Sequence, residues 1–433
     1  MIEVFRIANY VFYALLALSF VLLMPKIVFH IMGMGKSKVF PKAKKNHRYA
    51  ILIAARNESK VIGQLLENIK NQDYDQNLLD TYVIVESKDD PTCEICKKFD
   101  RVHVFVREHL ERKGKGYALD ECFTKILAEN TNEDEKYEAF FIVDADNILK
   151  KNFITEMNKC FDAGYEVACG YRNNKDWNST WVSTCSGLLF TDFSTFKAKG
   201  KARVGFNVQA TGTGFYVSRR MIEDFQGWKF NTLTEDFEFY LYTVLTNCPS
   251  TYNHNAIFYD EQPTTLKVSW RQRVRWCKGF FQAGKIYNRQ LLKSAFKRNT
   301  TMKRKYDSFE TATSVVPLAV SIITVLGYGL FNFVLGIVGA CLKDPLWYWP
   351  MIACAGVAGG FYLLMIFYTM FMFLVDRKRI NIKPHKAFVA CLTNPFFMCL
   401  YIPIVLQAIC SKNVQWKPIE HTKLVSDEQV KNG

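Results

Sequence analysis

Residues 139–146 read AFFIVDAD, an apolar run that ends in two aspartates on either side of one alanine. The apolar run has the length and composition of a buried strand. Similar runs stand upstream at residues 49–55 (YAILIAA), 82–86 (YVIVE) and 102–106, with helix-compatible stretches near 59–71 and 117–129. Apolar strands that alternate with helices predict an α/β domain with a largely parallel sheet covered on both faces.

Polar residues follow these strands where ligands bind in such sheets, beyond the carboxyl ends. They are Arg56, Asn57 and Glu58 after the first strand, Glu86 after the second, and Asp144 and Asp146 after the fourth. Two carboxylates one residue apart suit Mg²⁺ or Mn²⁺, which can bridge to a diphosphate. A D-x-D alone is more often a turn or a helix cap. Its position in line with the other acidic strand ends favours a metal site.

Three further segments combine glycine or charge with helix or turn signals. Residues 112–119 (RKGKGYAL) place Lys115 between glycines at the start of a helix, where backbone and ammonium groups can approach an anion. Residues 211–220 (TGTGFYVSRR) allow close backbone approach to a ligand, although a simple hairpin explains them equally well. In residues 231–240 (NTLTEDFEFY), Thr234 is expected to cap a helix with acidic residues in its first turn, or one carboxylate is a general base.

Residues 269–281 (SWRQRVRWCKGFF) are basic and aromatic together. On a helix, Gln272, Arg275 and Trp276 share one face, which offers an amide, a guanidinium for phosphate and an indole for the apolar face of a sugar. The remaining residues, Arg271, Arg273, Lys278 and the phenylalanine pair, predict an amphipathic helix at a membrane interface.

The bulk composition supports a membrane protein. The chain has 433 residues, is 49% hydrophobic and carries a net charge of +15. Basic residues with interleaved aromatics could bind nucleic acid. The basic clusters lie beside apolar segments, however, where membrane electrostatics explain them, so no nucleic-acid partner is expected. The 13 cysteines show no disulfide framework, and Cys93 and Cys96 stand without a second metal-binding pair.

Four segments could cross or enter a bilayer. Residues 7–24 form an apolar run followed by six lysines between residues 26 and 45, which predicts a retained anchor with the following chain in the cytosol. The other candidates are residues 312–341, 347–374 and 387–410. Pro395 beside Asn394 makes the last one a full span or a broken, re-entrant helix, and the side of the C-terminus depends on which.

Taken together, these motifs resemble those of membrane-embedded family 2 glycosyltransferases, the group that includes cellulose, chitin, hyaluronan and poly-N-acetylglucosamine synthases. The resemblance covers about residues 48–283 and rests on ARNE (55–58), Lys115, DAD (144–146), GTGFY (212–216), TED (234–236) and QRVRW (272–276). It implies a nucleotide-sugar-binding domain of the glycosyltransferase A type, mostly parallel and flanked by helices, with N- and C-terminal transmembrane helices. The implied reaction is an inverting transfer from a UDP-sugar.

The resemblance also implies roles for residues. Asp236 would deprotonate the acceptor, and Asp144 and Asp146 would hold the donor diphosphate through Mg²⁺ or Mn²⁺. Donor and acceptor contacts would come from Arg56, Glu58, Glu86, Lys115, Asp144, Glu235, Gln272, Arg275 and Trp276. Glu86 departs from the family pattern, where aspartate is frequent.

The expected organisation has five parts. They are an anchor (1–34), a cytosolic catalytic domain (35–265), interfacial helices (266–305), a transmembrane region (306–411) and a polar tail (412–433) in a multi-pass cell-membrane protein. The leading hypothesis is a processive synthase that extends a β-linked polysaccharide and exports it. The alternatives are a single-addition transferase acting on polyprenyl phosphate or diacylglycerol, and an inactive scaffold of the same fold.

Overall fold

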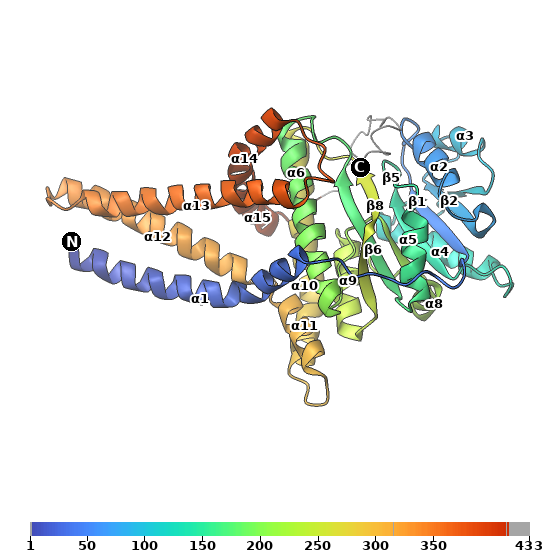
Figure 1. Ribbon diagram of the computed structural model, residues 1–433, viewed down its shortest axis with the longest axis horizontal. Coiled ribbons are helices and arrows are strands. Elements are labelled where there is room, and N and C mark those ends of the chain that lie inside the picture. Colours follow the sequence, from blue (N-terminus) through green and yellow to red (C-terminus); the bar gives the residue numbers. More distant parts are fainter. Residues whose placement is uncertain (1, 315, 413, 415–433) are drawn as a thin grey trace.

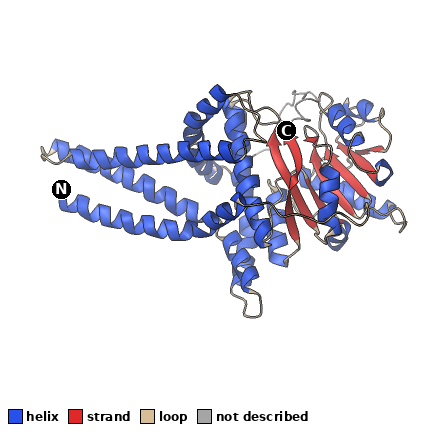
Figure 2. Cartoon of the chain, in the orientation of Figure 1, coloured by secondary structure: helices blue, strands red, loops and turns tan. Residues whose placement is uncertain are grey.

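The computed structural model describes residues 2–314, 316–412 and 414, so the expected polar tail lies almost entirely outside the described residues (Figure 1). A sheet with helices on both faces forms one end of the molecule, and long helices extend from the other (Figure 2). This arrangement separates the polar middle of the chain from its apolar ends.

One eight-stranded sheet organises the globular half of the chain, in the order β3-β2-β1-β4-β7-β6-β8-β5. The strands are β1 (Tyr49–Ala54), β2 (Leu79–Val85), β3 (Val102–Val106), β4 (Ala139–Asp144), β5 (Ile148–Leu149), β6 (Val167–Asn174), β7 (Phe215–Ser218) and β8 (Ser250–Asp260). The strands expected from the sequence, β1 to β4, pair in parallel. The sheet as a whole is mixed, because β7 pairs antiparallel with both β4 and β6.

Both faces of the sheet are covered, as the apolar strands predict. Alternate residues of β1 point to opposite faces, so Ala50 and Leu52 join one core and Ile51 and Ile53 join the other. The covering helices are α2 (Ile62–Lys70), α3 (Thr92–Cys96), α4 (Lys115–Glu129), α5 (Phe153–Asp162), α8 (Arg219–Phe225) and α9 (Glu235–Thr246). The two cores hold the carboxyl ends of the strands in fixed register.

A continuous helical segment lies between the sheet and the long apolar helices (Figure 1). It consists of α6 (Trp181–Thr191), a π-helical turn η2 (Asp192–Ala198) and α7 (Lys199–Val204). Asp192 accepts a hydrogen bond from His30 Nε2 at 3.2 Å. Tyr171 donates to Asp376 at 2.7 Å. These bonds connect the sheet-containing half to helices from both ends of the chain.

Within the described residues, four helical segments are long and apolar enough to cross a membrane: Ile2–Met34, Ala319–Cys341, Tyr348–Val375 and Pro384–Cys410. They correspond to α1 (Ile2–Met34), α12 (Val316–Cys341), α13 (Tyr348–Val375) and the pair α14 (Pro384–Cys399) and α15 (Tyr401–Cys410). The last segment is broken, which was one of the two expected outcomes.

The position of the break differs from the expectation. Pro395 lies inside α14, and the chain bends at Leu400 instead. Pro403 follows by three residues and has no N–H to donate to the carbonyl of Cys399. Pro403 therefore explains the position of the break better than Pro395 does.

Two helices connect the halves. They are α10 (Leu266–Ala295), which packs against α9 and α15, and α11 (Met302–Ala312), which leads toward α12. The helix expected near residues 269–281 is therefore the first half of a longer one.

Candidate active site

The parallel register of β1, β2 and β4 brings their carboxyl ends to one edge of the sheet. Ala54 pairs with Ile84 on one side and with Asp144 on the other. Arg56 and Glu86 meet just beyond this edge, with 3.0 Å between Arg56 Nε and Glu86 Oε2. The first and second strand ends thus form one polar surface, as the sequence predicted.

The turn after β1 is held by residues that the sequence analysis missed. Asn57 has a positive φ of 58°, which asparagine tolerates better than most residues. Its backbone N–H donates to Asp90 Oδ2 at 2.9 Å, and that of Glu58 donates to Thr92 Oγ1 at 3.1 Å. Asp90 and Thr92 therefore fix the conformation of Arg56 to Glu58.

Lys115 is the first residue of α4 and reaches across to the end of β4. Its ammonium group bonds the carboxylate of Asp144 and the carbonyl of Gly212, the latter at 2.8 Å. Gly116 lies against the carbonyl of Phe230, where a Cβ atom would approach to 2.2 Å. This close packing explains why glycine follows the lysine, and it sets the direction of the helix.

The DAD segment is fixed by a network that no motif predicts. The backbone N–H of Asp144 donates to Thr213 Oγ1 at 2.8 Å, and Asp146 accepts from the N–H of Glu261 at 3.0 Å. At the end of β8, Asp260 is ion-paired with Arg172 from β6. Arg172 also donates to the carbonyl of Thr211 at 2.8 Å. Pairing between strands distant in sequence creates these contacts, so single segments gave no signal for them.

Negative charge gathers around Asp144 and Asp146. Burial raises the pKa of Asp260 to about 6. The positive charge of Arg172 opposes this rise, and the negative charges of Asp146 and Asp144 add to it. No group of three His, Cys, Asp or Glu side chains within residues 2–314, 316–412 and 414 forms a metal cage. A Mg²⁺ or Mn²⁺ ion fits this site when one or two carboxylates share it with substrate phosphates.

The TED residues stand at the N-terminus of α9. Thr234 occupies the cap position, but its side chain makes no capping bond and packs instead on Gly279. Thr234 therefore precedes the helix as expected, with acidic residues in the first turn, but its side chain does not supply a capping bond. The close approach of α10 at Gly279 explains why the side chain is held there.

Glu235 and Asp236 lie near the positive charges of Lys115 and Arg275. Burial, followed by the charge of Asp236, raises the pKa of Glu235 to about 7. Burial also raises the pKa of Asp236, and the nearby positive charges of Arg275 and Lys115 oppose this. Gly212 lies beside Asp236, since a Cβ atom there would be 3.4 Å from its Oδ2. The structure thus brings Lys115, Asp144, Glu235 and Asp236 together.

The face of α10 that was predicted to contact substrate points toward these four residues. It carries Gln272, Arg275 and Trp276. Arg275 donates to the carbonyl of Leu233 at 2.8 Å, directly before the TED segment. The ring of Trp276 lies 5.9 Å from that of Phe190, edge to face. Phe190 stacks on Arg172 at 3.7 Å, and Gln272 is half-buried on the same helix. Phe190 was missed because its segment, α6, reads as an ordinary apolar helix.

The opposite face of α10 does not lie free at an interface as expected. Arg273 is 1% exposed and stacks on Phe397 and Tyr401 of α14 and α15, at 4.0 and 5.0 Å. Lys278 donates to the carbonyl of Ser411 at 2.6 Å. Arg273 and Lys278 therefore contact the C-terminal part of the chain, because the broken helix covers this face of α10.

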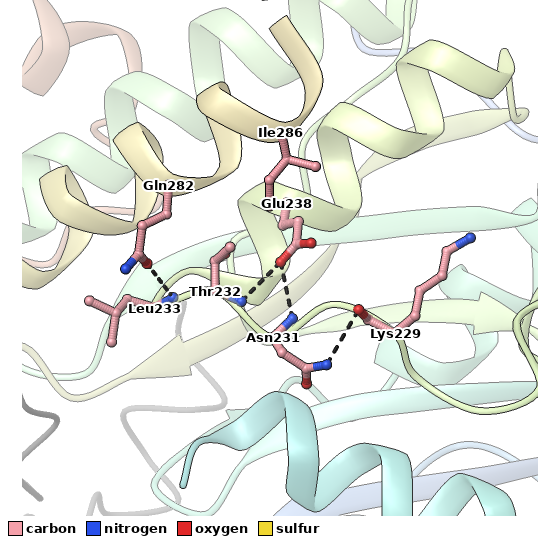
Figure 3. Close-up of a pocket in the computed structure, with 7 residues that line it drawn as sticks. All are labelled: Lys229, Asn231, Thr232, Leu233, Glu238, Gln282 and Ile286. Atoms are coloured by element: carbon pink, nitrogen blue, oxygen red, sulfur yellow. Dashed lines mark hydrogen bonds between the residues drawn. The ribbon is translucent and has the colours of Figure 1, made fainter. Parts of the chain in front are cut away.

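A pocket of about 420 Å³ lies between α10 and the loop that precedes α9 (Figure 3). Its floor is the loop before α9, which Glu238 holds by accepting the N–H groups of Asn231 and Thr232 at 3.0 and 2.9 Å. Gln282 of α10 accepts the N–H of Leu233 at 3.1 Å. These bonds fix the loop that positions Glu235 and Asp236.

Comparison with known proteins gives an independent indication of what this site does. The family model described as "Glycosyltransferase like family 2" matches residues 47–279. The β-monoglucosyldiacylglycerol synthase of Trichormus variabilis is 24% identical over 54% of this chain and 49% of its own length. The poly-β-1,6-N-acetyl-D-glucosamine synthase of Staphylococcus epidermidis is 22% identical over 53% of this chain and 54% of its own length. The chain thus matches about half the length of these curated relatives.

A solved structure of similar fold is that of a mannosyltransferase from Pyrobaculum calidifontis in complex with GDP-Man and Mn²⁺. It has a TM-score of 0.60 and 13% identity, and covers 94% of this chain and 100% of that one. At this identity the likeness concerns the fold. The family match covers more than half of the chain and includes every strand of the sheet. The chain therefore belongs to glycosyltransferase family 2, and its sheet-containing half has a glycosyltransferase A-type fold.

Proposed function

We propose that this protein transfers a hexose, with inversion, from a UDP-sugar to a hydroxyl group of a membrane lipid. The single observation that carries this proposal is the position of α10. One face of this helix points to Asp236, and the opposite face packs on α14 and α15 through Arg273. A helix is about 10 Å thick. The catalytic groups would therefore lie one helix away from the apolar helices.

The donor would bind at the carboxyl edge of the sheet. Arg56, Glu58 and Glu86 would contact the nucleoside, since they follow β1 and β2 at this edge. Asp144 and Asp146 would hold Mg²⁺ or Mn²⁺, which neutralises diphosphate charge when bound. Lys115 and Arg275 would add positive charge beside the leaving diphosphate. The named carbohydrate ligand of the fold relative, GDP-Man, supports a nucleotide-sugar donor in general.

The transfer needs one base and one leaving group. Asp236 would take the proton of the acceptor hydroxyl as its oxygen attacks the anomeric carbon, while the bond from that carbon to the diphosphate oxygen breaks on the opposite face. Lys115 and Arg275 favour the ionised form of Asp236 that this step requires. Trp276 and Gln272 would position the acceptor, because an indole face suits the apolar face of a ring or glyceride.

The membrane segments favour a lipid acceptor. The apolar windows of α1 and α13 are only 6% and 11% buried within the described residues. Figure 1 shows these helices extending away from the sheet. Such helices give a lipid lateral access to the site. The similarity to a β-monoglucosyldiacylglycerol synthase also supports this acceptor class. The catalytic half would face the cytosol, where the basic loops are expected.

The second candidate function is the extension of a polysaccharide with export, which the sequence favours through its QRVRW segment. The similarity to a poly-N-acetylglucosamine synthase supports it. Both functions use the same donor site and base. They differ in the acceptor and in the size of the product.

The test is a transfer assay with the full chain in lipid nanodiscs, Mn²⁺ and a panel of labelled UDP- and GDP-hexoses. We expect label from one UDP-hexose in a small product that extracts into chloroform and methanol. Long, polydisperse, water-soluble product would instead establish the polysaccharide function. Transfer from a GDP-sugar alone would contradict the proposed donor.

A further inference from the structure

The hairpin formed by α10 and α11 is strongly basic. From residue 262 to residue 306 the chain has thirteen Lys and Arg residues and no Asp or Glu. Seven of the thirteen lie in residues 289–306, which we call the hairpin tip. Catalysis uses the other end of α10, around Arg275. The charge of the hairpin tip therefore has no role in the site described above.

The hairpin tip also exposes large apolar side chains. Phe296 at the end of α10 is 74% exposed, and Met302 at the start of α11 is 76% exposed. The ring of Phe296 contacts that of Phe309, itself exposed, at 6.3 Å. Exposed apolar side chains surrounded by Lys and Arg are typical of segments that lie at a membrane interface.

The acidic residues that follow do not neutralise the hairpin tip. Asp307 and Glu310 are buried, and both pair with the buried Lys201 of α7, at 3.5 and 2.6 Å. Asp307 also accepts from the N–H of Asn207 at 3.1 Å. These contacts fix α11 to the catalytic half and leave the basic side chains of the tip to other partners.

The orientation of α11 suits a membrane surface. Figure 1 shows α11 running across the direction of α12 and α13, with its end close to the start of α12. If α12 crosses the bilayer, α11 lies along the surface from which α12 emerges. The hairpin tip then lies near lipid headgroups.

We propose that the hairpin tip docks on anionic phospholipid headgroups, with Phe296 and Met302 in the interface and Lys293, Lys297 and Arg298 on the phosphates. Basic residues close to an anionic leaflet each gain favourable electrostatic energy. The same helix carries Gln272, Arg275 and Trp276, so docking fixes the height of the active site above the bilayer. This inference does not depend on which sugar or acceptor the enzyme uses.

The experiment replaces Phe296 with the photo-crosslinking analogue p-benzoylphenylalanine in the full chain. The protein is placed in nanodiscs of phosphatidylcholine with a minority of phosphatidylglycerol and irradiated, and its adducts are identified by mass spectrometry. We expect lipid adducts in which phosphatidylglycerol exceeds its share of the bilayer by about twofold or more. No lipid adduct, or adducts in proportion to the bilayer composition, would overturn the proposal.

Charge variants provide the matched control. The triple variant Lys293→Gln, Lys297→Gln and Arg298→Gln should lose the enrichment. A control variant with the same charge change on the far side of the sheet should retain the enrichment, because α2 and α3 lie away from the membrane helices (Figure 1). Its substitutions are Lys70→Gln, Lys97→Gln and Lys98→Gln. Equal enrichment in both variants, or crosslinking mainly to a second copy of the chain or to nucleic acid, would contradict the docking of the tip on lipid.

Discussion

Lys115, the first residue of α4, is ion-paired with Asp144, the last residue of β4. Burial alone would lower the pKa of Lys115, but the carboxylates of Asp144, Glu235 and Asp236 raise it overall. The lysine therefore stays charged and links the proposed metal ligands to the proposed base. Lys115 would therefore add positive charge beside a bound diphosphate.

The metal assignment predicts a defined effect of Asp146→Asn. Loss of one carboxylate should reduce the enhancement of UDP-sugar binding by Mn²⁺ about tenfold or more, because hard cations require charged oxygen ligands. Titration calorimetry with and without Mn²⁺ measures this effect. Asp134→Asn, in an exposed loop, is the control and should leave both affinities unchanged. Equal donor affinity with and without the metal in the unaltered protein would contradict the assignment.

The two tryptophans of α10 should behave differently. Trp276→Ala should raise KM for the acceptor about tenfold, the loss expected for an aromatic contact, with little change in donor KM. Trp270→Phe is the matched control, because Trp270 Nε1 donates to Gln407 Oε1 at 2.6 Å on the membrane side of the helix. Its acceptor KM should not change. A rise in donor KM alone for Trp276→Ala would contradict the acceptor role.

Two glycines separated by one residue should also differ. Both have positive φ, 81° for Gly212 and 64° for Gly214. A Cβ atom at Gly214 would overlap the buried ring of Phe258 at 2.1 Å, so Gly214→Ala should prevent stable folding. At Gly212 it would lie 3.4 Å from Asp236 Oδ2, so Gly212→Ala should fold but lose about a hundredfold in transfer. Thermal melting and the transfer assay distinguish the two effects.

The pH dependence should report the carboxylates of α9. Burial and the charge of Asp236 raise the pKa of Glu235 to about 7, and burial raises the pKa of Asp236 as well. Asp236 must be ionised to accept a proton, so kcat/KM should fall toward acidic pH, and this fall should begin at a higher pH than an ordinary aspartate would give. Glu235→Gln removes a neighbouring negative charge and should move this fall to lower pH. If Glu235→Gln left the fall of kcat/KM at acidic pH unchanged, another group would control this fall.

The sequence predicted the first half of the sheet because β1 to β4 are continuous apolar runs of strand length. It did not predict β6 and β8, whose polar residues, such as Arg172 and Asn253, form hydrogen bonds to partners distant in sequence. The same limit applies to the site. Lys115, Asp144 and Asp236 stand in recognisable segments. Arg172, Asp260 and Phe190 enter the site through strand pairing and helix packing, which no local pattern records.

The membrane part shows a similar division. Length and apolar composition were enough to predict four helical segments near their observed positions. The break at Leu400 was expected near Pro395, because the sequence does not show which proline the surrounding packing accommodates. Arg273 was expected at the interface because its charge suggested water or headgroups. Two aromatic rings from the broken helix bury it instead.

The central claim is that Asp236 is the base of a hexosyl transfer at this site. The most direct measurement is transfer of labelled hexose from the active UDP-sugar by the unaltered protein and by Asp236→Asn in the same nanodiscs. Donor binding is measured in parallel. We expect Asp236→Asn to bind the donor with nearly unchanged affinity and to lose about a thousandfold in transfer. Transfer at an undiminished rate in Asp236→Asn would contradict this claim.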